Sequence, residues 1–242
     1  MKTRMQLKDI TIEEIYLNEL TGKNNWKKLC MEYRLPDEII EEFANKIDWN
    51  LISVYQELSE KLMDKYSRKL NWGFISDYQT LSEKFIEDHI DKIKWRRISR
   101  GQILSEKFIS KHKNEVDWKY IISYQVLSEK FIEEYLDKID WNGIVVHQKL
   151  SKEFMIKYQD KLNFELISDH QILSEGEIEL FLDKLNWNLI SKRQTLSEQF
   201  IEKHQDKVNW NRIFEYQNLS QEFKEKHKNK ITSALFKRLF TK

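Results

Sequence analysis

Six histidines are the side chains of this sequence best suited to bind a metal or to transfer protons: His89, His112, His147, His170, His204 and His227. Zinc sites need several His, Cys or carboxylate ligands at short, defined spacings. The sequence has no His-Glu-x-x-His motif and a single cysteine, Cys30. It also has no Gly-rich phosphate loop and no nucleophile elbow. We therefore expect no metal, no cofactor and no catalytic residue, and hence a protein that is not an enzyme.

Positive charge is concentrated around Trp95, in a basic cluster of Lys92, Lys94, Arg96, Arg97 and Arg100. Such a cluster binds an acidic protein surface or nucleic-acid phosphates. A basic face that is merely solvated is the alternative interpretation. Lys94 also replaces the Asp or Asn that precedes most of the equivalent aromatic residues, so a helix cap worth about 1 kcal/mol is missing there.

Tryptophans at regular spacing could stack nucleobases. All eight lie on one 23-residue register, and a phenylalanine fills its single gap. We call these nine aromatic residues the keystone residues: Trp26, Trp49, Trp72, Trp95, Trp118, Trp141, Phe164, Trp187 and Trp210. From Trp49 onward an Ile follows three residues later, on the same face of a helix. This pattern favours a structural role in the core over base stacking.

A glutamine lies seven residues after each keystone residue from Trp49 onward, at Gln56, Gln79, Gln102, Gln125, Gln148, Gln171, Gln194 and Gln217. Helical arrays that read one base per repeat must vary the reading residue, and this glutamine does not vary. The series instead predicts a buried amide ladder in which each side chain satisfies backbone groups of the loops.

These positions belong to a repeat of two short helices. A Leu-Ser pair, usually followed by Glu, opens one helix, as in Leu81-Ser82-Glu83, and an Asp or Asn caps the keystone helix, as at Asp117. Helices of about 11 and 8 residues cannot bury their own apolar faces, so neighbouring repeats must stack. The sequence predicts an all-α fold, a right-handed α-solenoid of about nine 23-residue two-helix repeats with terminal caps.

The repeat leaves no room for a linker, so we expect a single helical-repeat array over residues 1–242. Residues 1–22 form a degenerate N-terminal cap, with Thr11 and Glu14 at capping-box spacing. Residues 228–242 form a C-terminal cap helix, with Phe236 and Phe240 at the Ile and Gln positions and Lys230, Lys237 and Lys242 on its polar side.

Positions two and six after the keystone residues vary from repeat to repeat and are neighbours on one helix face. We call them the ridge: Leu51/Tyr55, Phe74/Tyr78, Arg97/Gly101, Tyr120/Tyr124, Gly143/His147, Leu166/His170, Leu189/Arg193 and Arg212/Tyr216. Its aromatic and arginine content is typical of interaction hot spots, although packing between repeats is an alternative. The candidate partner-binding residues are Lys94, Arg96, Arg97 and Arg100 with Phe74, Tyr78, Tyr120, Tyr124, Leu166, His170, Leu189 and Arg193.

Composition narrows the functional classes. The 242 residues include 41 Lys and Arg against 40 Asp and Glu, which argues against a protein that neutralises many phosphates. A single cysteine suits a reducing compartment. No stretch approaches the roughly 20 apolar residues of a membrane span, and residues 1–20 lack a signal-peptide core. We therefore expect a cytoplasmic protein without membrane contact.

The Leu-Ser-Glu-Lys-Phe-Ile, Asp-Lys-Ile-Asp-Trp and Ile-Ser-x-Tyr-Gln blocks resemble short helical repeats in uncharacterised proteins of large DNA viruses and some phages. The resemblance covers nearly the whole chain. It implies an array architecture and a viral origin, and hence the host cytosol as location, but it brings no catalytic or binding residues.

The sequence therefore leads to two functional hypotheses. The first is a non-enzymatic scaffold that binds another protein, derived from the host, and that engages or inhibits a host defence component. The alternative is a nucleic-acid-binding repeat protein that uses the basic cluster.

Overall fold

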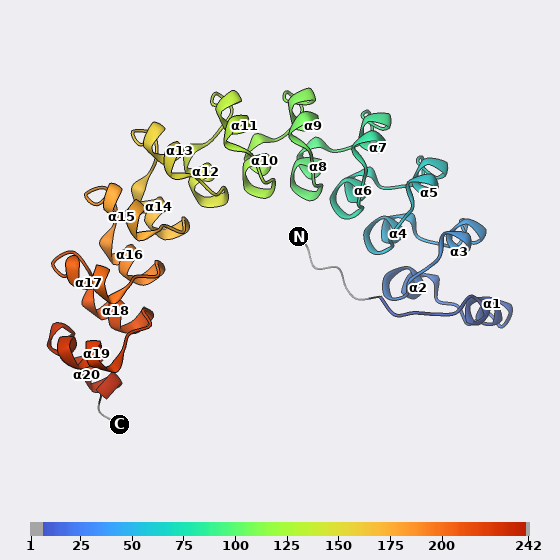
Figure 1. Ribbon diagram of the computed structural model, residues 1–242. Coiled ribbons are helices and arrows are strands. Elements are labelled where there is room, and N and C mark those ends of the chain that lie inside the picture. The colour runs from blue at the N-terminus through green and yellow to red at the C-terminus, as the bar shows by residue number, and fades with distance from the viewer. Residues whose placement is uncertain (1–6, 241–242) are drawn as a thin grey trace. The chain divides into compact units, whose positions relative to one another are not determined.

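The computed structural model describes residues 7–240, which form short α-helices joined by tight turns (Figure 1). The predicted all-α solenoid is confirmed, because repeated helices pack against their neighbours along the chain. In the described range the only β contact is an isolated parallel bridge between Lys8 and Tyr33. Residues 1–6 and 241–242 of the predicted terminal caps, and the side chains of Lys237 and Phe240, lie outside the described part.

The first of two compact units ends at Gln125. It opens with α1 (Ile12–Leu20), and its other helices form two rows (Figure 1). The keystone row contains α2 (Trp26–Glu32), α4 (Trp49–Tyr55), α6 (Trp72–Tyr78), α8 (Trp95–Gly101) and α10 (Trp118–Tyr124). The second row contains α3 (Asp37–Glu42), α5 (Glu60–Lys65), α7 (Glu83–Asp88) and α9 (Glu106–Lys111). Within this unit, each keystone helix packs against its neighbours in the keystone row.

The second unit begins at Val126 and has the same two rows. Its keystone row contains α12 (Trp141–His147), α14 (Phe164–His170), α16 (Trp187–Arg193) and α18 (Trp210–Tyr216), followed by α20 (Ser233–Phe240). Its second row contains α11 (Glu129–Glu134), α13 (Lys152–Lys157), α15 (Glu175–Leu180), α17 (Glu198–Lys203), α19 (Gln221–His227) and the 3₁₀ turn η1 (Lys228–Lys230). Helix α20 starts one repeat length after Trp210 and lies within the range 228–242.

The second-row helices are shorter than the expected 11 residues. Helix α7 has six residues and ends at Asp88, because His89 leaves the helical conformation at φ −123° and ψ 29°. The chain then continues in a turn in which the Ile93 N–H donates to the His89 carbonyl at 3.2 Å. Phe85, Ile86, His89 and Ile93 are all buried. The predicted apolar stripe is therefore present, but it runs across a helix and the turn that follows.

The helix caps form where the sequence predicts them. Ser82 accepts a hydrogen bond from the Phe85 N–H, and the equivalent serines cap the other second-row helices from α5 to α19. Thr11 and Glu14 form the complete capping box of α1. Pro36 occupies the N-cap of α3 without a side-chain bond. Among the keystone helices α2 to α18, α8 is the one without a side-chain cap bond, and its N-cap residue is Lys94.

The predicted amide ladder is confirmed and joins each repeat to the one before it. Gln102 is buried, and its Oε1 accepts from the Leu81 N–H at 3.0 Å. Its Nε2 donates to the Gln79 carbonyl at 2.7 Å and to the Ser76 carbonyl at 3.1 Å. Gln79 makes the same three bonds one repeat earlier, to Leu58, Gln56 and Ser53. The glutamine recurs in the repeats because one amide satisfies three backbone groups of the preceding repeat, as Gln79 and Gln102 show.

Two further polar contacts link neighbouring repeats at several of the junctions. The fully buried Ser76 donates to the Trp72 carbonyl at 2.7 Å and accepts from the Lys94 N–H at 3.0 Å. In the Leu-Ser-Glu block, the Glu83 carboxylate accepts from the Ser105 N–H of the following repeat at 2.6 Å. The Leu-Ser-Glu block therefore makes three separate backbone contacts. The Leu N–H donates to a Gln side chain, and the Ser side chain accepts from an N–H of its own helix. The Glu carboxylate accepts from a backbone N–H of the next repeat.

The keystone tryptophans keep the predicted register but are half-buried. The Trp72 N–H donates to the Ser67 carbonyl at 2.8 Å, and its ring stacks on His89 at 4.8 Å between centroids. The ammonium group of Lys92 lies 5.5 Å from the Trp72 ring centre. The fully buried core residue of this helix is Ile75, three positions further on.

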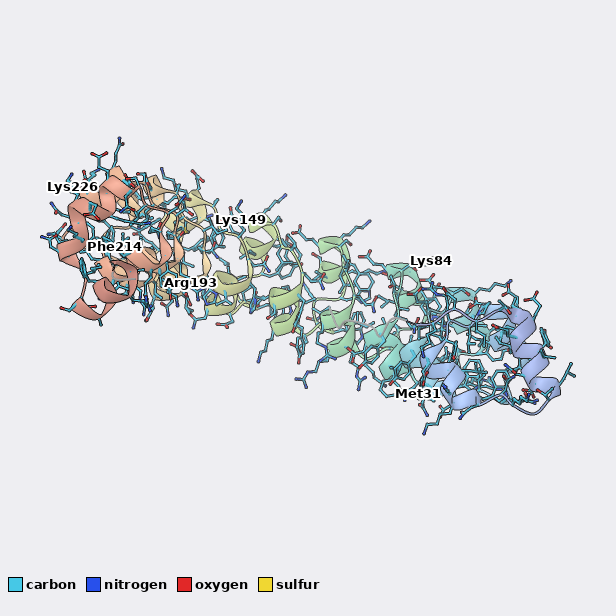
Figure 2. The ribbon with its side chains drawn as sticks, turned by 90° about the horizontal axis from the view of Figure 1, so that it is seen from below. Met31, Lys84, Lys149, Arg193, Phe214 and Lys226 are labelled. Atoms are coloured by element: carbon cyan, nitrogen blue, oxygen red, sulfur yellow. The ribbon has the colours of Figure 1, made fainter. Side chains whose placement is uncertain are left out.

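The charged residues lie mainly on the surface of each unit. Figure 2 shows Lys84 and Lys149 at the outside of the ribbon, and both are exposed. Within the residues that the structure describes, no helix is long and apolar enough to cross a membrane.

Candidate functional site

The structure gathers six of the candidate residues into one depression in the first unit. It has a volume of ≈ 420 Å³ and is lined by Phe74, Asp77 and Tyr78 of α6, Arg96, Arg97 and Arg100 of α8, and Tyr120 of α10. Because α6, α8 and α10 pack side by side in the keystone row, residues about 23 apart in the sequence meet here. Lys94 and Tyr124 were predicted with this group and do not line the depression.

A buried carboxylate anchors two of the three arginines. The side chain of Asp77 is 6% exposed, and Nη2 of Arg100 lies 2.7 Å from its Oδ2. Nη1 of Arg97 lies 3.4 Å from the same oxygen and also donates to the Gly73 carbonyl at 3.0 Å. The hydrogen bond with Asp77 raises the pKa of the Arg100 guanidinium above its ordinary value. Asp77 therefore neutralises only part of the basic cluster.

Aromatic rings hold the same arginines in place. The guanidinium carbon of Arg97 lies 5.9 Å from the Phe74 ring centre. Those of Arg96 and Arg100 lie 5.3 and 5.9 Å from the ring centre of Tyr120. Arg96 Nη2 also donates to the Tyr120 hydroxyl at 3.1 Å, and its Nε lies 3.7 Å from Asp117. Stacking of this kind fixes a guanidinium while leaving its N–H edge available.

Two glycines allow the arginines to approach α6. A Cβ atom on Gly73 would lie 3.2 Å from the Asn71 Oδ1 and 3.4 Å from the guanidinium carbon of Arg97. A Cβ atom on Gly101 would lie only 3.1 Å from the Asp77 carbonyl. Gly101 also occupies the ridge position that holds Tyr78 and Tyr124 in the neighbouring repeats. The ridge is therefore interrupted by a residue without a side chain next to the depression.

Lys94 is exposed, and its own side chain does not cap α8. Its backbone N–H is nevertheless satisfied by Ser76 of the previous repeat. What Lys94 lacks is only the side-chain cap bond, which an Asp or Asn at this position would accept from a backbone N–H in the first turn of α8. Tyr124 is 54% exposed, and its ring lies 6.0 Å from that of Tyr120.

The remaining candidates lie in the second unit, on the adjacent helices α14 and α16. Leu166 and Leu189 are half-buried, whereas His170 and Arg193 are exposed. Nε of Arg193 lies 2.7 Å from Oδ1 of Asp169. This pair resembles Arg100 with Asp77, because Asp77 and Asp169 occupy the same register position. It has a single arginine per carboxylate, so it leaves no comparable excess of positive charge.

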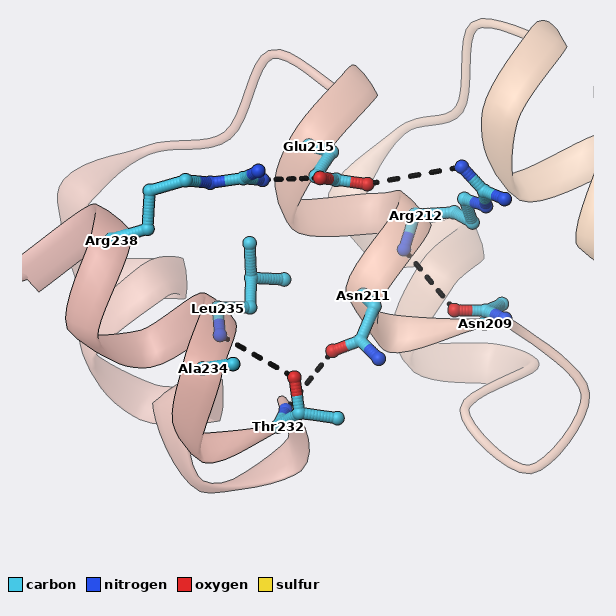
Figure 3. A pocket seen from close by; sticks show the side chains of 8 residues that line it. All are labelled: Asn209, Asn211, Arg212, Glu215, Thr232, Ala234, Leu235 and Arg238. Atoms are coloured by element: carbon cyan, nitrogen blue, oxygen red, sulfur yellow. Dashed lines mark hydrogen bonds and ion pairs between the residues drawn. The ribbon is translucent and has the colours of Figure 1, made fainter.

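A second depression, of ≈ 620 Å³, lies between α18 and α20 (Figure 3). Its charges are compensated internally, because Glu215 pairs with Arg238 and lies 3.9 Å from Arg212. Asn211 accepts from the Thr232 N–H at 3.0 Å and Asn209 from the Arg212 N–H at 3.2 Å. The Glu215–Arg238 pair and the Thr232–Asn211 bond attach the terminal helix to the last repeat.

The histidines have structural surroundings. His89, His112, His204 and His227 are buried against the keystone tryptophans. His204 Nε2 lies 2.8 Å from Glu179, which also accepts from Lys203 at 2.7 Å. The hydrogen bonds from these two side chains lower the pKa of Glu179. Among the described residues, no three His, Cys, Asp or Glu side chains are grouped so that they could hold a metal ion.

Asp77, Gly73 and Gly101 were not recognised as site residues from the sequence. The available signal was an Asp five residues after one keystone residue, Asp77, followed in the next repeat by arginines two and five residues after the keystone residue, Arg97 and Arg100. The two glycines were a second signal in a chain with only five. Comparisons of the chain with family models, curated proteins and solved structures found no match.

Proposed function

We propose that this protein is a non-enzymatic helical-repeat scaffold that binds another protein through the ridge of its keystone helices. The observation that carries the proposal is the depression between α6, α8 and α10. It combines three arginines, a phenylalanine and two tyrosines, the residue types that are enriched at binding hot spots. The invariant positions are already used for packing and for the contacts between repeats, whereas the ridge varies.

The proposed partner is a host protein. This part of the proposal is supported only by the resemblance of the repeat blocks to those of large DNA viruses and phages. In that setting the scaffold would act in the host cytosol, and inhibition of a defence component would be its role.

Affinity capture from a cell lysate tests the main proposal. The bait is the full chain, compared with a ridge variant, Tyr120→Ala/Leu166→Ala, and a second-row variant, Lys84→Ala/Lys130→Ala. We expect a protein that the wild type and the second-row variant retain and the ridge variant loses. If every retained protein binds all three baits equally, the ridge is not the binding surface and the proposal fails.

Nucleic-acid binding is the second candidate function, and the observation that favours it is the cluster of three guanidinium groups around two carboxylates, Asp77 and Asp117. A phosphate binder must lose affinity steeply as salt rises. Titration of the full chain with single-stranded DNA and RNA between 50 and about 200 mM salt measures this directly. If the protein has no measurable affinity for DNA or RNA at low salt, nucleic-acid binding is excluded as its function.

A further inference from the structure

The α8 repeat differs from its neighbouring repeats at Lys94, Arg96, Arg97 and Arg100, and some of these differences disfavour the isolated α8 helix. Lys94 removes a cap, while Arg96 and Arg100 place like charges at i,i+4 spacing on one helix. The equivalents of Arg97 and Arg100 in the preceding repeat are Phe74 and Asp77. Packing between repeats therefore does not require three arginines here, since neighbouring repeats stack with other residues at these positions.

The arginines also keep unused donors. In the described part of the chain, Arg100 bonds only through Nη2 and Arg97 only through Nη1. The Nε and the second terminal nitrogen of each group make no such bond there. Arg96 has a side chain 75% exposed and stands at the rim. Because Phe74, Tyr120 and Asp77 already fix these groups, a ligand would lose little conformational entropy in ordering them.

We propose that this depression binds a short acidic segment of a partner protein, with Asp or Glu carboxylates paired to Arg96 and Arg97. The inference rests on the proposed scaffold function and specifies the chemistry of the partner. Guanidinium groups bind carboxylates in a bidentate manner, and Phe74 and Tyr120 supply apolar surface beside them. Arg100 stays on Asp77 and acts as a positioning residue.

Charge distribution favours a peptide over a nucleic acid. The other ridge positions in this unit are Leu51/Tyr55, Phe74/Tyr78 and Tyr120/Tyr124, which carry no cation. A nucleic acid presents a charge at every nucleotide, so its binding groove must stay positive along the backbone. Here the three arginines of the depression belong to one repeat, and Asp77 and Asp117 lie beside them. Such a site matches a few carboxylates.

The test measures fluorescence anisotropy of a labelled peptide, Gly-Glu-Glu-Leu-Glu-Glu-Gly, with the full chain. The variant is Arg96→Gln/Arg97→Gln, which leaves Arg100 to neutralise the buried Asp77. Arg212→Gln is the matched control, because Arg212 occupies the register position of Arg97 and also lies over a ring, 5.8 Å from Tyr216. We expect at least tenfold weaker binding for the double variant and less than a twofold change for the control.

Two further probes make the result decisive. The same peptide with Gln in place of Glu should not bind, and a single-stranded oligonucleotide of equal charge should bind more weakly than the acidic peptide. Equal affinities of wild type and double variant, or tighter binding of the oligonucleotide, would overturn the inference. A circular dichroism melt checks folding, and Arg96→Gln alone, at an exposed side chain, replaces the double variant if that variant is unfolded.

The two proposals fail separately. If the peptide does not depend on Arg96 and Arg97 but a captured protein still depends on Tyr120 and Leu166, only the acidic-segment inference is wrong. If no captured protein depends on the ridge, the scaffold function itself is wrong.

Discussion

Substitution of Gln102 by Leu tests whether the amide ladder holds the repeats together. The change removes the acceptor of the Leu81 N–H and the donor to the Gln79 and Ser76 carbonyls. An unsatisfied buried group costs about 1–3 kcal/mol, and the N–H has no second way to bond. The leucine offsets part of this loss by burying apolar surface. We expect a net loss of about 2–4 kcal/mol in the free energy of unfolding.

Urea unfolding followed by circular dichroism measures the loss. Repeat arrays can unfold in parts, so hydrogen exchange of the Leu81 amide gives a second, local measurement and should accelerate in the variant. Gln217→Leu is the matched control. Gln217 makes the same three bonds, to Leu196, Gln194 and Ser191, but is only half-buried, so water can replace part of them.

Gln217→Leu should lower the free energy of unfolding by less than half as much as Gln102→Leu does. A Gln102→Leu variant within 0.5 kcal/mol of the wild type would refute the reasoning, because surface-like changes fall in about that range. Equal losses at Gln102 and Gln217 would show that burial of the amide is not what sets the cost.

Three other perturbations test local contacts. Lys94→Asp restores a cap to α8 and should raise the unfolding free energy by about 0.5–2 kcal/mol in urea titration; a decrease would contradict the capping argument. Ser191→Ala removes the acceptor of the Asn209 N–H, at 2.9 Å, and should lower the free energy of unfolding by about 1–3 kcal/mol. Ser82→Gly, which removes a helix cap, should lower the free energy of unfolding by only a few tenths of a kcal/mol. Hydrogen bonds from lysines lower the pKa values of Glu87, Glu179 and Glu202 below the ordinary 4.5. Their stabilisation is therefore present above pH 4.5 and lost as the pH falls below it. The urea midpoint should fall on acidification, and less so in the triple Glu→Gln variant; an equal fall would exclude these carboxylates as the cause.

Sequence reasoning located the amide ladder because its signal is a strict repeat. Gln102 recurs at a fixed distance from a keystone residue, next to loop residues whose backbone groups need partners, so its role followed from counting. The tryptophans obey the same register, yet their half-burial did not follow from it. An indole N–H must reach an acceptor, and where Trp72 finds one depends on the turn at Ser67.

The site was predictable only in part. The basic cluster and the aromatic ridge could be read from the residues of single helices. Their combination with Asp77 could not, because Asp77 lies 23 residues before Arg100 and in a different repeat. The same holds for Gly73, whose missing side chain makes room for the Arg97 guanidinium.

The helices, their caps and the register of the repeat follow from the sequence alone, because they depend on interactions between residues a few positions apart. Which charges are compensated and which donors remain available depends instead on contacts between repeats. Arg97 and Arg100 meet one buried carboxylate because the stacking of keystone helices brings successive repeats into contact. That contact limits the neutralisation of the basic cluster and leaves its unused guanidinium edges for a partner.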